Sequence, residues 1–170
     1  MKPLYGDKIE LLATDTDSFF YKIETDDVYM DMYKNKQYFD MSVYGINSPI
    51  YDPTNTKVIG KFSDECEGEI ISEFVGVRPK CYAFQLENNE VVKKLKGISK
   101  PVVKNTIQFE DYYNCVMDKK VKNEYVSVNA IRTDNMTNYS ICQNKKAFSN
   151  TDNKRHWDGT KSLAYGHYTI

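Results

Sequence analysis

The chain has 170 residues, of which 41% are hydrophobic, and its net charge is −1. The length predicts one domain or two small ones, and the hydrophobic content excludes a disordered chain. Residues 1–22 show no charged segment followed by an apolar run, and no apolar stretch in the sequence is long enough to span a membrane. We therefore expect an intracellular protein, in the nucleus or the cytoplasm, with no membrane partner.

The small net charge conceals two halves of opposite sign. Residues 1–75 carry 15 Asp and Glu against 7 Lys and Arg, a net of −8. Residues 76–170 carry 9 Asp and Glu against 16 Lys and Arg, a net of +7. This split fits an acidic part that binds a metal ion and a basic part that holds a polyanion such as nucleic acid. A solvated basic face is the alternative.

The first predicted element is a β-hairpin with acidic residues at its turn. Residues 9–12 and 19–23, on either side of Asp15-Thr16-Asp17-Ser18, are rich in aliphatic, β-branched and aromatic residues. Side chains two positions apart in an extended backbone point to the same side, so Asp15 and Asp17 can face one small volume. Two hard oxygen ligands held this close favour a divalent cation such as Mg²⁺, and such a site suits phosphoryl transfer.

The residues of the acidic turn suggest two other interpretations. Asp is common in ordinary turns, where it keeps strand ends soluble, and this alternative stays open. A calcium loop of the EF-hand type is excluded. With Asp15 as its first ligand, Phe19 stands where Asp or Asn is required and Phe20 where Gly is required.

The elements that follow alternate between helix and strand. We predict a helix over 25–36 with Thr25 as its N-cap, a turn-rich loop at 44–57, and a helix over 108–119 whose apolar stripe faces the core. Strands are predicted at 58–64, 69–86 (interrupted at Gly76 and Arg78-Pro79), 91–96, 124–134 and 137–148. The residues from Ser149 onward are polar and rich in turn formers, and we expect them to be loosely held.

The four cysteines show no spacing typical of a zinc site. Cys66, Cys81, Cys115 and Cys142 are scattered without a CxxC or Cys/His motif. This pattern predicts reduced, mostly buried thiols rather than metal ligands or disulfides.

Several motifs follow one another in a specific order. They are residues 12–19 (Leu-Ala-Thr-Asp-Thr-Asp-Ser-Phe), 77–82 (Val-Arg-Pro-Lys-Cys-Tyr), 93–98 (Lys-Lys-Leu-Lys-Gly-Ile), and the weaker segments 38–42, 57–62, 152–155 and 158–160. Together they resemble the C-terminal part of the family B DNA polymerases, closest to the protein-primed branch carried by viruses, linear plasmids and large self-replicating transposons. The resemblance spans nearly the whole chain.

The resemblance implies an α+β fold in two parts. Residues 1–99 would be the C-terminal part of the palm domain. Its antiparallel sheet would contain the 9–24 hairpin and the strands within 58–97, backed by the 26–36 helix. Residues 100–170 would form a small thumb-like subdomain, a helix plus a hairpin with a loosely held tail.

The resemblance also implies a role for each motif residue. Asp17 would be the carboxylate that binds the catalytic Mg²⁺ ions, and Asp15 a neighbouring acid with an indirect or weaker metal role. Contacts to the primer strand would come from Thr16, Ser18, Lys80 and Tyr82. The phosphate backbone would be followed by Lys93, Lys94, Lys96 and Lys100. The alternative to phosphate contact is that these four lysines are solvated and prevent the strand edge from pairing with another chain.

Two departures from the family pattern bear on activity. Ala13-Thr14 stand where the family has Tyr-Gly or Tyr-Cys before the first Asp, and the resemblance implies that loss of this Tyr would change the packing under the primer terminus and weaken its placement. A D-x-x-S-L-Y-P-S motif with the other metal-binding Asp, a lysine-bearing nucleotide-binding helix and exonuclease acids do not occur in residues 1–170. Two-metal catalysis needs carboxylates from both palm motifs. We therefore expect an incomplete Mg²⁺ site and no polymerisation by this chain alone. Deoxynucleoside triphosphates would bind only if another chain supplied the missing palm half.

Three functions remain open at this stage. The first is a fragment of a DNA-directed DNA polymerase that acts on primer–template DNA. The second is a non-catalytic DNA-binding module that retains the basic thumb region, and the third is an unrelated intracellular α+β domain. The first two differ in whether Asp17 matters, and the third predicts no salt-dependent DNA binding.

Overall fold

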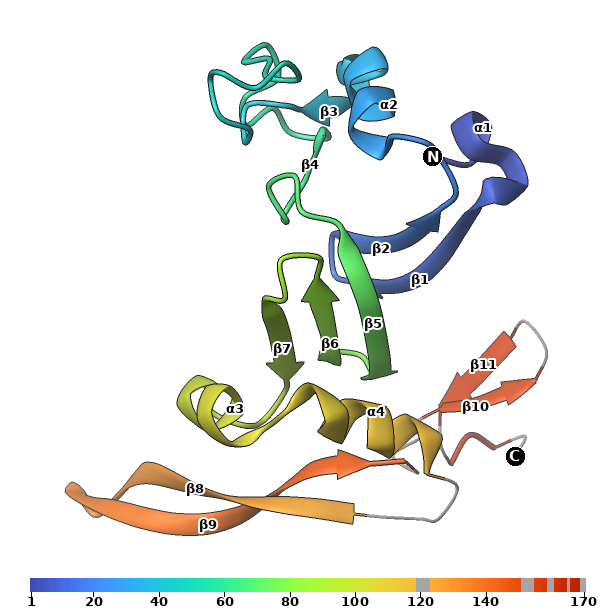
Figure 1. The fold of residues 1–170 in the computed structure, drawn as a ribbon. Helices are drawn as coiled ribbons and strands as arrows, with labels where there is room; N and C mark the ends of the chain where they lie inside the picture. The colour runs from blue at the N-terminus through green and yellow to red at the C-terminus, as the bar shows by residue number, and fades with distance from the viewer. Residues whose placement is uncertain (119–122, 151–154, 159–160, 165, 169–170) are drawn as a thin grey trace. The chain divides into compact units, whose positions relative to one another are not determined.

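The computed structural model describes residues 1–118, 123–150, 155–158, 161–164 and 166–168 (Figure 1). It has the α+β fold that the sequence predicts. The helices are α1 (Lys2–Tyr5), α2 (Val28–Lys34), α3 (Lys100–Thr106) and α4 (Phe109–Met117), with 3₁₀ helices η1 (Gly6–Lys8) and η2 (Lys36–Tyr38). The strands are β1 (Ile9–Asp15), β2 (Ser18–Ile23), β3 (Phe39–Asp40), β4 (Phe62–Ser63), β5 (Ile71–Arg78), β6 (Cys81–Leu86), β7 (Val91–Leu95), β8 (Asn123–Asp134), β9 (Thr137–Ser149), β10 (Arg155–Asp158) and β11 (Lys161–Ala164).

The chain divides into two compact units of opposite charge. One unit contains residues 1–73 and 85–90, with 7 Lys and Arg against 17 Asp and Glu, a net of −10. The other contains residues 74–84 and 91–170, with 16 Lys and Arg against 7 Asp and Glu, a net of +9. We call them the acidic unit and the basic unit. The structural division separates the charges more sharply than a cut at residue 75, because the turn at 85–90 adds its two glutamates to the acidic unit.

The acidic unit begins with the predicted hairpin and helix. β1 and β2 pair antiparallel, with Ile9 opposite Ile23 and Asp15 opposite Ser18. α2 is shorter than predicted, and its N-cap is Asp27 rather than Thr25. The Asp27 side chain accepts a hydrogen bond from the Met30 backbone N–H at 3.0 Å, which satisfies one of the free donors in the first helical turn.

The loop after α2 is held by one buried carboxylate. Asp40 is 7% exposed. It accepts hydrogen bonds from the Ser42 hydroxyl and backbone and from the Lys57 backbone, and these lower its pKa. Around it lies a small core of Phe39, Met41, Tyr44 and Ile50, with Tyr29, Met32 and Tyr33 of α2 packed against it. α2 thus covers this loop core rather than a palm sheet.

Three strand predictions need correction. The 58–64 strand is reduced to β4, which pairs parallel with β3, because Lys57 and Gly60 adopt left-handed φ values of 54° and 86°. β5 continues through Gly76, where a Cβ atom would lie 3.1 Å from the Phe74 ring, so the glycine makes room and does not break the strand. The hairpin β1–β2 and the sheet β5–β6–β7 are separate sheets in the described chain, not one palm sheet.

The basic unit is built around one core. The antiparallel strands β5, β6 and β7, the helices α3 and α4 and the base of the β8–β9 hairpin contribute to it (Figure 1). Its fully buried members include Cys81, Ala83, Tyr112, Ala147 and Phe148. α4 begins with a capping box between Gln108 and Asp111. The predicted burial of its apolar stripe is confirmed for Tyr112, and Phe109 packs against the core, but Tyr113 and Val116 are 49% and 50% exposed.

β8 and β9 form a long two-stranded ribbon, as predicted from residues 124–134 and 137–148. The strands have 12 and 13 residues, and their pairing runs from Asn123 opposite Ser149 to Asp134 opposite Thr137. Only the base of the ribbon is buried, and its other end extends away from α4 (Figure 1). Beyond it, the segment predicted to be a loosely held tail contains the antiparallel pair β10–β11. Residues 152–154 and 159–160, part of the last polymerase-like motifs, lie outside the described residues. No helix in the described ranges is long and apolar enough to cross a membrane.

Candidate active site and nucleic-acid interface

The acidic hairpin closes in a two-residue turn. Asp15 is the last residue of β1, Ser18 is the first of β2, and Thr16 and Asp17 form the turn between them. Thr16 has a φ of 62°, so residues 15–17 are not extended. Asp15 and Asp17 therefore do not lie on one side of an extended backbone, and this prediction is wrong. Asp15 is partly buried at the strand end, and Asp17 is exposed in the turn.

Thr16 is the strained residue of this turn. β-Branched residues rarely adopt positive φ values, because the branched Cβ crowds the backbone. A two-residue hairpin turn with a positive φ at its first central position normally has glycine there. The threonine instead places a hydroxyl 3.4 Å from Asp15 Oδ1, to which it donates a hydrogen bond. Backbone strain of this kind is frequent at functional sites.

A third acid lies at the hairpin, and sequence reasoning missed it. The Ser18 hydroxyl donates a hydrogen bond to Glu65 Oε1 at 2.7 Å, across 47 positions of sequence. On the other face of β2, the Phe19 ring meets the Phe62 ring edge-on, with centroids 5.7 Å apart. Residues 62–65 therefore pack beside the start of β2. The acidic run at 64–65 was visible in the sequence, but nothing local indicated where it would fold.

The carboxylates of the turn are the candidate Mg²⁺ ligands. Asp15 and Asp17 supply hard oxygen donors, which suit Mg²⁺, with water or phosphate oxygens at its other positions. No group of three or more His, Cys, Asp or Glu side chains in the described residues is arranged to hold a metal ion. Two carboxylates from one turn fit a single, weakly held ion better than the two ions of nucleotidyl transfer.

The thiols do not form a reactive site. All four cysteines are free, as predicted; Cys81 is buried, Cys66 and Cys115 are partly buried, and Cys142 is exposed. Burial, together with the negative charge of Asp64, Glu65 and Glu90, raises the pKa of Cys66 to about 11. Cys66 therefore stays protonated at neutral pH and is a poor nucleophile.

Lys80 and Tyr82 lie in the basic unit, on either side of the start of β6. Lys80 is exposed in the β5–β6 turn with a φ of 60°, and its carbonyl accepts a hydrogen bond from the Lys96 backbone N–H. Tyr82 is only 8% exposed and stacks on Phe74 at 6.1 Å. The tyrosine thus has a packing role, and its contact with a primer strand stays a prediction.

The four predicted backbone-binding lysines differ in their surroundings. Lys93 is on the same face of β7 as buried Leu95, and its ammonium group donates to the carbonyls of Lys104 and Ile107. It therefore caps the C-terminal end of α3, where a cation is favoured. The exposed lysines are Lys94, Lys96 and Lys100, for which the described residues show no ion pair. These three remain the candidates for phosphate contact.

Comparison with known proteins gives no match: no protein-family model, no curated protein and no solved structure matches the chain. A functional assignment therefore depends on the residues and their geometry.

Strain at Thr16 leads to the first prediction. Thr16→Gly should raise the free energy of unfolding by about 0.5 kcal/mol, because glycine adopts the left-handed conformation without a steric cost. Thr14→Gly, at the penultimate residue of β1, should lower it by about 1 kcal/mol. Urea unfolding followed by circular dichroism measures both values. An equal loss of stability in both variants would contradict the strained turn.

The capping role of Lys93 gives the second prediction. Lys93→Met should lower the free energy of unfolding by about 1–2 kcal/mol, since it leaves the carbonyls at the end of α3 without their charged donor. Lys96→Met, which removes an exposed ammonium group from the same segment, should change it by less than about 0.5 kcal/mol. The same urea titration compares the two, and equal effects would exclude the cap.

Proposed function

We propose that the chain is the C-terminal palm and thumb portion of a family B DNA polymerase of the protein-primed type. The complete enzyme would add nucleotides to a primer 3′ end under the direction of a template. The observation that carries the proposal is the antiparallel hairpin that presents Asp15 and Asp17 at its turn. It stands at the position where the polymerase-like motif predicts a catalytic hairpin.

In this proposal each acid has a distinct role. Asp17, exposed at the tip, would bind the catalytic Mg²⁺, and Asp15 would support it from the strand end. Mg²⁺ would neutralise the phosphate charge that develops during nucleotidyl transfer. The complete two-metal site would need a further carboxylate from the family's other palm motif. Another chain that carries that motif would then be a partner, along with primer–template DNA and deoxynucleoside triphosphates.

The finer description of the fold belongs to the same proposal. The β1–β2 hairpin and the β5–β7 sheet would be parts of the palm, and α3, α4 and the β8–β9 ribbon would form the thumb. The supporting observation is the charge of the basic unit, a net of +9, on elements that would grip a duplex.

A second candidate function is favoured by the same charge separation. The basic unit has its own hydrophobic core, and its exposed lysines belong to this unit, whereas Asp15 and Asp17 belong to the acidic unit. A non-catalytic DNA-binding module would need no more than this. The two candidates differ in the importance of Asp17 and agree on the importance of the lysines.

DNA binding is the prediction that both candidates share. The chain should bind duplex DNA with an affinity that falls linearly with log salt, by about 0.9 per phosphate contacted. Replacement of Lys94, Lys96 and Lys100 by Gln should reduce that slope by up to about 2–3. Lys2, Lys8 and Lys57, exposed lysines of the acidic unit, provide the matched triple control. Fluorescence anisotropy from 50 to 200 mM salt measures the slope, and equal slopes for the two triple variants would exclude the basic unit as the interface.

Catalysis separates the two candidates. The pure chain should not extend a primer, whereas extension should occur when a second chain supplies the D-x-x-S-L-Y-P-S motif with Mg²⁺. Asp17→Asn should abolish that extension and leave DNA binding unchanged, because it removes a metal ligand and not a phosphate contact. Asp7→Asn is the control for an exposed acid of the same unit. Extension that survives Asp17→Asn would reject the catalytic role, and extension by the pure chain would show that its site is complete.

A further inference from the structure

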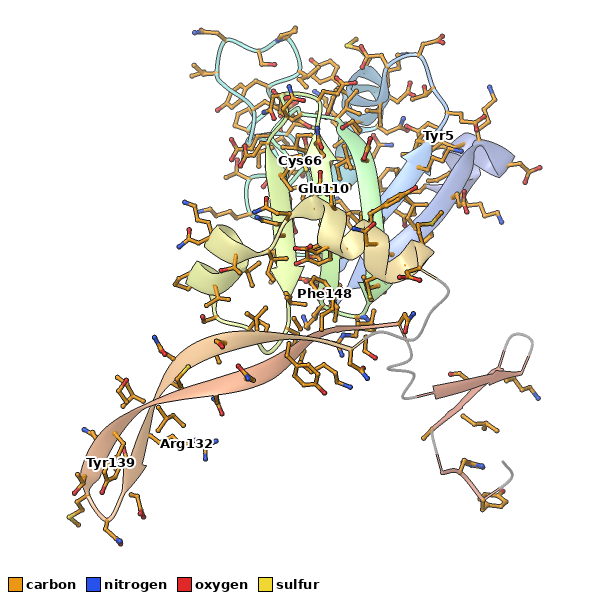
Figure 2. The ribbon with its side chains drawn as sticks, turned by 60° about the horizontal axis from the view of Figure 1, so that its bottom comes forward. Tyr5, Cys66, Glu110, Arg132, Tyr139 and Phe148 are labelled. Atoms are coloured by element: carbon orange, nitrogen blue, oxygen red, sulfur yellow. The ribbon has the colours of Figure 1, made fainter. Side chains whose placement is uncertain are left out.

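The part of the β8–β9 ribbon beyond its buried base is an exposed two-stranded arm. We define the arm as residues 129–142. They lie between the turn and the pair formed by Val128, which is buried, and Gln143. Its apolar side chains are largely exposed: Ile131 by 79% and Tyr139 by 49%. Figure 2 shows Arg132 and Tyr139 near the end of the ribbon, and these two residues are opposite each other in the register. The arm therefore contributes little to the core of the basic unit.

The turn at the end of the arm has an unusual residue. Asn135 and Met136 both have positive φ values, 45° and 61°. Such turns strongly favour Asn-Gly, and the Asn at the first position follows that rule. Met136 does not, and its side chain is 99% exposed. The methionine thus adopts an unfavourable backbone conformation and gains no packing within the described chain.

The composition of the arm fits contact with base edges more than with phosphates. Apart from Arg132 and Asp134 it has no charged residue. Its outward face carries amides and hydroxyls, including the Thr133 hydroxyl, which donates to the Asn138 side chain at 2.6 Å. Amide and hydroxyl side chains can hydrogen-bond base edges without adding charge, whereas Lys and Arg supply the positive charge that neutralises phosphates. The lysines of the same unit, with its net charge of +9, would supply the backbone contacts.

A two-stranded ribbon has suitable dimensions for a DNA groove. The major groove, about 12 Å wide, admits such a ribbon. Ribbon-type DNA-binding proteins place their strands in either groove, and those that bind the minor groove frequently insert an apolar side chain, Met among them, between two base pairs and kink the duplex. We propose that the 129–142 arm enters a groove of duplex DNA and that Met136 is inserted between base pairs, bending the duplex. This inference depends on the DNA binding proposed above and specifies duplex DNA as the ligand of the arm.

A bending assay with matched substitutions tests the arm. A duplex of about 20 base pairs with a donor and an acceptor fluorophore at its two ends reports bending as increased energy transfer. The full chain should increase the transfer. Met136→Leu should keep the increase, and Met136→Asn, which is shorter, polar and suited to the turn, should abolish it and weaken binding about tenfold or less. Both variants should leave the salt slope unchanged.

A second pair of variants tests the position of the arm. Asp134 is two residues from Met136, so its carboxylate would lie close to DNA phosphates, and Asp134→Asn should tighten binding about threefold or more. Glu110→Gln, an exposed acid of α4 (Figure 2), should have a smaller effect. Equal effects would place the arm away from the DNA.

The outcomes separate this inference from the proposed function. Salt-dependent binding without an increase in energy transfer rejects the insertion of Met136 between base pairs, and so does an increase that Met136→Asn retains. Either result leaves the proposed function standing. No salt-dependent binding at all rejects both. Concentration-dependent self-association in sedimentation that is lost in Met136→Asn would show that the exposed tip contacts a second copy of the chain. This result would also reject the insertion of Met136 between base pairs.

Discussion

The basic unit depends on one aromatic contact, between Tyr112 of α4 and Phe148 of β9. The rings meet edge-on with centroids 4.9 Å apart, and both side chains are fully buried. The Tyr112 hydroxyl also donates to the backbone carbonyl of Lys94 on β7 at 3.1 Å. Burial raises the pKa of Tyr112, so the hydroxyl keeps its proton and the buried hydrogen bond is maintained. One side chain thus fixes α4, the lysine-bearing strand and the base of the ribbon together.

Side chains along β7 point alternately toward the helices and toward solvent, and this determines which lysines are accessible to a ligand. Leu95 and Lys93 point toward the helices, so the Lys93 ammonium group ends at the carbonyls of α3, while Lys94 and Lys96 point to solvent. A run of lysines in the sequence therefore does not act as one basic patch. One member stabilises the helix on which Lys100 is located, and the others remain available. The side-chain alternation of the strand thus separates the capping lysine from the exposed ones.

Local patterns predicted the local elements well. The β8–β9 ribbon, the β6–β7 hairpin and α4 each follow from periodicity and turn residues within a few positions. The acidic hairpin was also predicted, but not the conformation of its turn, because Thr16 is a residue that avoids left-handed φ values. Long-range placement was not predictable: the Ser18–Glu65 hydrogen bond joins residues 47 positions apart, and no single segment indicates it. The single palm sheet was wrong for the same reason.

Thr16, Lys80 and Met136 each adopt a positive φ in a hairpin turn of the described chain. Asn89 and Asn135 tolerate this conformation, because a short polar side chain can hydrogen-bond locally. Threonine, lysine and methionine have no such preference for this conformation, and glycine would relieve the strain at each of these turns. At two of them the chain retains a hydroxyl beside Asp15 and an exposed apolar side chain. Such violations are expected where contact with a ligand, and not folding, determines the residue.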